Sequence, residues 1–279
     1  MKLKNFKFRN IFFCCFLLLV SMLSFGQNKK SDEIILTDNG VILDLKGTFK
    51  INWDKSDSDV PCSAIEYGEM LFYPDNKDIV NEKAIVLKPR DFDYHNWDES
   101  RNAEKEFADM EKAKVEKLKK FFPEELKKME KIQKGELQSP IKVKIKKVTP
   151  YTECDFTTVY AQVTEIKKID GTKSKITKLE VKKSDESDDF DEPHLDEVGY
   201  LQEYEVKTKD EYVNMREKPT TDSKTVLKLK NDETVKYIMS DGNWYYVYKV
   251  VYPSKNNKDS KIREFRGFVH KSQLRKINY

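Results

Sequence analysis

The chain has 279 residues and a formal net charge of +3, and 36% of its residues are charged against 38% that are hydrophobic. The hydrophobic share, which includes 16 Phe and 14 Tyr, excludes a wholly disordered chain and is sufficient for one or two folded domains. A net charge this close to zero gives no support for nucleic acid as the partner.

The first 26 residues have the pattern of a secretory signal peptide. Four basic residues precede an apolar run from Ile11 to Leu23, and Ser24, Phe25 and Gly26 follow it. The run is shorter than the roughly 20 residues that span a bilayer. We therefore expect cleavage after Gly26 and export to the periplasm or the extracellular space, with no stable membrane anchor afterwards. An uncleaved anchor is the alternative.

Cleavage would change the charge balance of the protein. Residues 1–26 contain four basic and no acidic residues, so the mature chain would hold 48 basic and 49 acidic residues. The small positive charge of the full chain therefore comes from the signal segment.

Residues 27–183 are expected to form a first domain of mixed α/β (α+β) class. Short runs with alternating or continuous apolar residues predict strands; they lie at 41–45, 47–53, 65–73, 84–88, 141–148, 156–169 and 176–181. Between them, residues 98–134 have apolar residues at helical spacing, with Asp98 as a candidate N-cap and an interruption at Pro123. This stretch predicts a helical interlude. The first domain resembles no family that we recognise.

An acidic segment at residues 184–204 predicts the linker between two domains. It contains nine acidic residues and no Lys or Arg, and its first half has almost no aliphatic residues, so it is unable to bury a core of its own. Asp185, Ser187, Asp189 and Asp196 match part of the spacing of a calcium-binding loop, but Phe190 stands where that loop requires glycine. We therefore expect a solvated linker and no metal site.

Candidates for catalysis are few. His95 and Cys62 are the one pair that would fit a nucleophile with its base, and neither has the strand–helix context typical of such enzymes. Cys62 and Cys154 are the only cysteines after residue 26. In an exported protein they form a candidate disulfide, with two free buried thiols as the alternative. No cofactor-binding motif is present, and we expect no catalytic activity.

Residues 205–279 have the pattern of a small antiparallel β-barrel. Short runs rich in Val, Tyr, Ile and Trp are separated by Asn, Asp, Gly and Pro. From Trp244 to Tyr252 both faces of the predicted strand carry apolar groups. Such a strand is either central to a barrel or leaves aromatic residues outside for a ligand.

Residues 205–276 resemble the bacterial Src homology 3 (SH3)-like domain. Three motifs in the right order carry the resemblance: Val213–Pro219, Gly242-Asn243-Trp244 and Gly267–His270. The sequence departs from the family at Asn231-Asp232, where a glycine is usual, and at Phe268, where Trp is usual. The resemblance implies an all-β barrel that binds a ligand, often cell-wall peptide, and implies no catalysis.

The expected function is therefore non-catalytic binding at the bacterial cell envelope, to peptidoglycan or to an envelope protein or peptide. The candidate ligand-binding residues all belong to the barrel; they are Asn214, Arg216, Trp244, Tyr246 and Phe268. Two alternatives stay open. In the first alternative, the protein is a cell-wall hydrolase whose first domain is catalytic. In the second, the barrel serves only as a scaffold that packs on the first domain.

Overall fold

The computed structural model describes residues 32–37, 40–55, 66–82, 84–88, 103–153, 156–180, 201–253 and 261–278, all within one unit, residues 32–279. Several predictions lie outside these residues and stay predictions. They concern the signal peptide, the Cys62–Cys154 pair, His95, and the linker and calcium-loop readings of residues 184–200.

Strands dominate the described residues, so the protein is mostly β. Two α-helices, α2 (Ala103–Phe121) and α3 (Pro123–Met129), fall in the stretch for which the sequence predicts helix. Pro123 occupies the first turn of α3, where its missing N–H costs no hydrogen bond. Of the described helices, none is long and apolar enough to cross a membrane.

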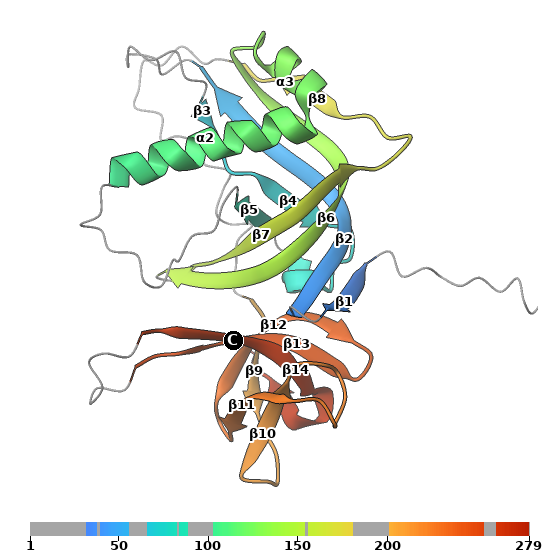
Figure 1. The fold of residues 1–279 in the computed structure, drawn as a ribbon, viewed down its shortest axis with the longest axis vertical. Helices are drawn as coiled ribbons and strands as arrows, with labels where there is room; N and C mark the ends of the chain where they lie inside the picture. The colour runs from blue at the N-terminus through green and yellow to red at the C-terminus, as the bar shows by residue number, and fades with distance from the viewer. Residues whose placement is uncertain are drawn as a thin grey trace, which may run out of the picture. The chain divides into compact units, whose positions relative to one another are not determined.

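Eight strands form the first sheet (Figure 1). Along the chain, the short helix η1 (Ile79–Glu82) follows the fourth of these strands. The strands are β1 (Glu33–Thr37), β2 (Gly40–Asp54), β3 (Glu66–Tyr67), β4 (Leu71–Pro74), β5 (Ile85–Lys88), β6 (Lys134–Glu153), β7 (Phe156–Lys168) and β8 (Lys175–Lys178). Figure 1 shows how strongly β2, β6 and β7 curve.

The first sheet closes on itself because β2 is paired on both edges. Residues 47–50 of β2 pair with β4, and residues 43–54 pair with β6. The order β2-β4-β5-β7-β6 then returns to β2, with β5 and β7 parallel and the other neighbours antiparallel. A five-stranded closed barrel with this order, and helices before its fourth strand, has the topology of the oligonucleotide/oligosaccharide-binding fold. Topology alone assigns no ligand.

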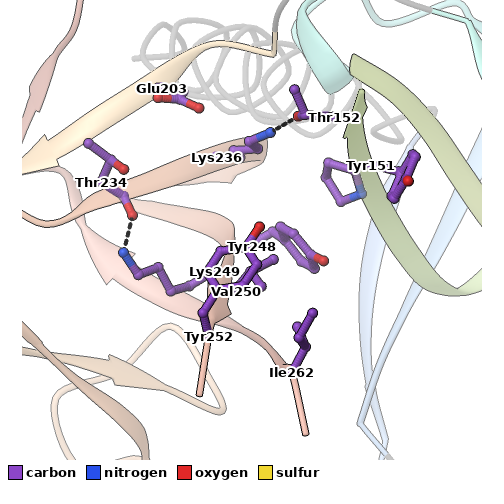
Figure 2. A pocket seen from close by; sticks show the side chains of 11 residues that line it. Tyr151, Thr152, Glu203, Thr234, Lys236, Tyr248, Lys249, Val250, Tyr252 and Ile262 are labelled. Carbon is purple, nitrogen blue, oxygen red and sulfur yellow. Dashed lines mark hydrogen bonds between the residues drawn. The ribbon is translucent and has the colours of Figure 1, made fainter. Parts of the chain in front are cut away.

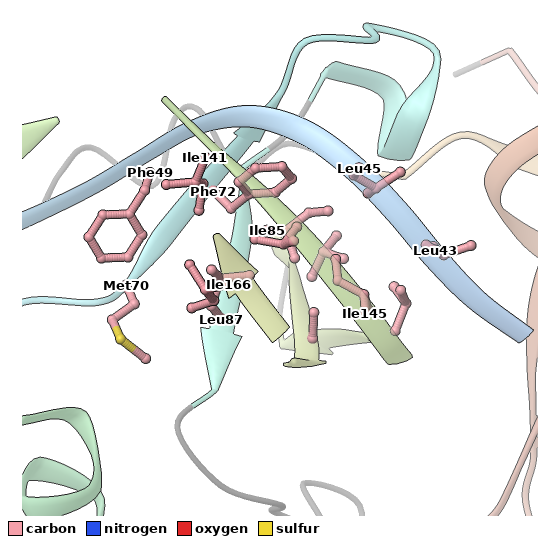
Figure 3. Packing of buried hydrophobic residues seen from close by; sticks show 14 of the residues in the cluster. Leu43, Leu45, Phe49, Met70, Phe72, Ile85, Leu87, Ile141, Ile145 and Ile166 are labelled. Carbon is pink, nitrogen blue, oxygen red and sulfur yellow. The ribbon is translucent and has the colours of Figure 1, made fainter. Parts of the chain in front are cut away.

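The interior of this first barrel is filled by the buried residues of alternating strand positions. In β2, Phe49, Ile51 and Trp53 are buried while the residues between them are partly exposed. Figure 3 shows Phe72 and Ile85 on neighbouring strands facing the same interior. The helices join this core through Phe122, whose ring stacks on that of Phe49 with centroids 4.7 Å apart.

The second sheet has seven strands in the order β11-β10-β14-β13-β12-β9-β15. They are β9 (Glu203–Val206), β10 (Tyr212–Arg216), β11 (Thr225–Lys230), β12 (Thr234–Asp241), β13 (Trp244–Val251), β14 (Arg263–His270) and β15 (Leu274–Lys276), with the short helix η3 (Lys271–Gln273) before the last strand. β9 begins within the segment predicted as linker, and Leu201 just before it is 1% exposed.

Gly47 provides a test of the closure of the first barrel. A Cβ atom at this position would lie 2.1 Å from the carbonyl oxygen of Tyr73 and 2.8 Å from ring atoms of Phe72, where β4 pairs with β2. We expect Gly47→Ala to lower the free energy of unfolding by about 2–3 kcal/mol, measured by urea denaturation. Gly68→Ala is the matched control, because its Cβ would have no heavy atom nearer than 3.4 Å. Equal stability of the two variants would contradict the closure at β2.

Candidate functional site

A groove on the second sheet brings together three of the five predicted ligand-binding residues. Its volume is about 650 Å³, within the usual range for small-ligand sites. The lining residues are Asp210, Tyr212, Asn214, Arg216, Thr221, Trp244, His270, Ser272 and Gln273. Asn214, Arg216 and Trp244 are the three that the sequence predicted.

Strand β10 supplies one wall of the groove through simple alternation. Val213 and Met215 point into the core of the second sheet, where both are at most 1% exposed. Tyr212, Asn214 and Arg216 therefore project from the opposite face. Hydrophobic patterning thus fixes which residues of this strand are available to a ligand.

The turn between β12 and β13 places Trp244 at the other side. Gly242 has a φ of +55°, a conformation that favours glycine. Trp244 then lies opposite His270 on β14, and the two rings meet edge to face with centroids 5.3 Å apart. His270 Nδ1 accepts a hydrogen bond from the backbone N–H of Ser272 at 3.3 Å, which orients the imidazole.

Arg216 and Asn214 give the groove its polar character. Arg216 Nη1 donates to the carbonyl oxygen of Ser223 at 2.6 Å, so the loop after β10 holds the guanidinium in place. The Oδ1 atom of Asn214 is buried and has no hydrogen-bond partner among the described residues. A buried acceptor without a partner costs free energy that a donor on a ligand would recover. The groove therefore combines a fixed cation, a buried acceptor without a partner among the described residues, and two aromatic residues, Tyr212 and Trp244.

Tyr246 and Phe268, the other two predicted residues, do not line the groove. They are 6% and 0% exposed, and their rings lie 5.0 Å apart on neighbouring strands. Both belong to the hydrophobic cluster that includes Leu43 and Leu45 of the first barrel. The part of the aromatic face of β13 around Tyr246 is thus covered by the chain itself, whereas Trp244 on the same face lines the groove.

Polar contacts surround this covered face. Asp78, just before η1, accepts hydrogen bonds through Oδ2 from Tyr237 Oη at 2.6 Å and Ser240 Oγ at 2.8 Å. Arg266 donates through Nη2 to Thr149 Oγ1 at 2.8 Å, and its guanidinium lies 4.9 Å from the ring centre of Tyr248. The three hydrogen bonds join residues more than 100 positions apart, so no local sequence pattern predicts them.

Sequence reasoning missed Tyr212 and Ser272 as groove residues. The signal for Tyr212 was present, because it shares the outward alternation of Asn214 and Arg216 on β10. Ser272 lies in η3, and its place follows from the hydrogen bond to His270. Among the described residues, no group of three or more His, Cys, Asp or Glu side chains is arranged to hold a metal ion.

Comparison with known proteins identifies the second sheet. Residues 211–274 match the family model of the bacterial SH3 domain, which confirms the resemblance noted in the sequence. No curated protein and no solved structure matches the chain.

The covered aromatic face predicts a pH effect on stability. Burial raises the pKa of Tyr246 to about 12, with the nearby Arg266 opposing the shift, whereas an unfolded tyrosine has a pKa of about 10. The raised pKa contributes stability that is complete below pH 10 and is lost as the pH rises to about 12. Urea denaturation across this pH range measures the effect. The free energy of unfolding of Tyr246→Phe should fall less steeply with pH than that of the wild type, by up to about 1.4 kcal/mol per pH unit. Parallel curves would mean that Tyr246 is exposed.

Proposed function

We propose that the protein is an exported, non-catalytic binding protein of the bacterial cell envelope, whose SH3 domain binds the peptide of peptidoglycan in the groove of Asn214, Arg216 and Trp244. Bacterial SH3 domains commonly serve as cell-wall binding modules. The observation that carries the proposal is the buried, unpartnered Oδ1 atom of Asn214 beside the anchored guanidinium of Arg216.

The chemistry of a cell-wall peptide fits these groups. Its amide N–H groups would donate to Asn214 Oδ1, and its carboxylates would pair with the remaining N–H groups of Arg216. Tyr212 and Trp244 each offer an apolar face with a polar edge, which suits a short peptide with few large side chains. Ser272 Oγ lies 2.8 Å from His270 Nδ1 in the groove, and the same nitrogen accepts the backbone N–H of Ser272. Binding without turnover is the function that we propose for these residues.

The scaffold alternative has an observation of its own. The buried face of Tyr246 and Phe268 packs the SH3 domain on the first barrel. Trp244 shares a face of β13 with Tyr246, and Arg216 pairs with Phe268, so the packing contact and the groove are neighbours on one face. They use different side chains, so the two roles are compatible. The hydrolase alternative depends on Cys62 and His95, which lie outside the described residues, and it stays without support from geometry.

Binding is tested by sedimentation of the purified protein with peptidoglycan sacculi. We expect Arg216→Ala to weaken binding at least tenfold, because a charge-assisted hydrogen bond is lost. Arg275→Ala is the matched control, since it removes the same charge from an exposed site outside the groove. Soluble stem peptide should compete with sacculi for the wild type.

Three results would count against the groove. The first is that the wild type does not sediment with sacculi, and an envelope protein then becomes the better candidate for the partner. The second is that Arg216→Ala and Arg275→Ala lose binding equally, which would indicate a general effect of charge. The third is that Arg216→Ala binds sacculi as the wild type does, and the binding site would then lie elsewhere.

Export is tested separately at the N-terminus. The basic start, the apolar run and the small residues before Gln27 predict cleavage after Gly26. Mass analysis of protein isolated from its host should find a chain that begins at Gln27 or its cyclised form. A retained Met1 would contradict export by a cleaved signal peptide.

A further inference from the structure

A second pocket lies where the end of β6 meets strands β12 and β13, and it is distinct from the groove (Figure 2). Its volume is about 470 Å³. The wall from β6 is Pro150, Tyr151 and Thr152. The remaining lining residues are Glu203, Thr234, Lys236, Tyr248, Lys249, Val250, Tyr252 and Ile262.

Lys236 is the polar group that gives this pocket a chemical preference. Its ammonium donates to Thr152 Oγ1, and among the described residues no carboxylate lies within ion-pair distance of it (Figure 2). Burial lowers the pKa of Lys236, and Glu203 on the neighbouring strand opposes this shift. A partly desolvated cation with only a hydroxyl as partner favours an anionic ligand group.

Lys249 is the second ammonium group of the pocket. Its ammonium donates to the carbonyl oxygen of Thr234 at 3.0 Å and lies 4.0 Å from Glu233, and its side chain is 17% exposed. The lining residues therefore carry two ammonium groups and the one carboxylate of Glu203. Because Glu233 is the ion-pair partner of Lys249, Lys236 is the ammonium group that a ligand carboxylate would meet.

The rest of the pocket is aromatic and apolar. Tyr151, Tyr248 and Tyr252 line it (Figure 2), and Tyr252, which follows β13, is 67% exposed. An exposed tyrosine offers a flat apolar face with a polar tip, which matches the face of a pyranose ring and its hydroxyl groups.

The strands around the pocket leave few backbone N–H and C=O groups to pair with an extended peptide. β12 is paired with β9 and β13, and β13 is paired with β12 and β14. On β6, Pro150 has no N–H, and the carbonyl of Val148 already accepts a hydrogen bond from Arg266. Recognition must therefore come from side chains, which favours a compact ligand over strand addition.

We propose that this pocket binds a sugar that carries a carboxylate, with the carboxylate at Lys236 and the ring face against Tyr252. The site is independent of the peptide groove. It would give the protein a second point of attachment to an acidic glycan, and simultaneous use of both sites would raise the overall affinity for a polymer that carries both groups.

The test is calorimetric titration of the purified protein with two sugars that differ in one group. N-acetylmuramic acid and N-acetylglucosamine share a ring, but only the first has a carboxylate. We expect the acidic sugar to bind at least tenfold more tightly than the neutral one. Galacturonic acid and galactose form a second such pair, which distinguishes a wall sugar from a uronic acid. Acetate tests the anion alone.

Variants assign the binding to this pocket. Lys236→Gln should abolish the preference for the acidic sugar, and Tyr252→Ala should weaken both members of a pair. Tyr252 is exposed, so its removal leaves the fold intact even if Lys236→Gln destabilises it. Lys230→Gln, an exposed lysine of β11 outside the pocket, is the control for charge and should bind as the wild type does.

Several outcomes would overturn the proposal: no binding of either acid, equal binding of acid and neutral sugar, acetate binding as tight as the acidic sugar, or wild-type behaviour of Tyr252→Ala. Arg216→Ala should leave the sugar titration unchanged. Failure of the pocket is therefore distinguishable from failure of the groove.

Discussion

The packing of Tyr246, Tyr248 and Phe268 against the core of the first barrel is the contact on which the rest of the structure depends. These rings are almost fully buried in the same cluster as the interior of β2. Fully burying a large apolar side chain contributes about 1.5–3 kcal/mol relative to exposure. Asp78 fixes the arrangement by accepting hydrogen bonds from Tyr237 and Ser240.

This packing decides which surface of the SH3 domain remains for a ligand. On the face of β13 that carries both residues, Tyr246 is covered by the chain, whereas Trp244 lines the groove between β10 and the Gly242 turn. The same junction creates the pocket of Lys236 and Tyr252, to which the end of β6 contributes. The two proposed sites therefore have different origins: the groove belongs to the SH3 domain alone, and the pocket requires both barrels.

Much of the second sheet could be predicted because its signals are local. Short β runs, the Gly242 turn and the alternation of Val213 with Asn214 depend on neighbouring residues. The surface against which the aromatic face of β13 packs could not be predicted. The alternation of apolar residues along a strand shows that a face is apolar, but it does not show which residues cover that face. The closure of the first barrel was missed for a similar reason. It depends on the pairing of residues 43–54 of β2 with residues 134–145 of β6, and no local pattern in either segment predicts this pairing.

Under the proposed function, the ligand contacts the groove and does not contact Tyr246 and Tyr248 of β13. Hydrogen exchange measured by mass spectrometry, with and without a soluble peptidoglycan fragment, tests this most directly. The account predicts that the fragment slows exchange in residues 212–216, 242–244 and 270–273. It also predicts that residues 246–250 are already slow without the fragment and do not change. Ligand-dependent protection centred on Tyr246 and Tyr248, with none at the groove, would contradict the account.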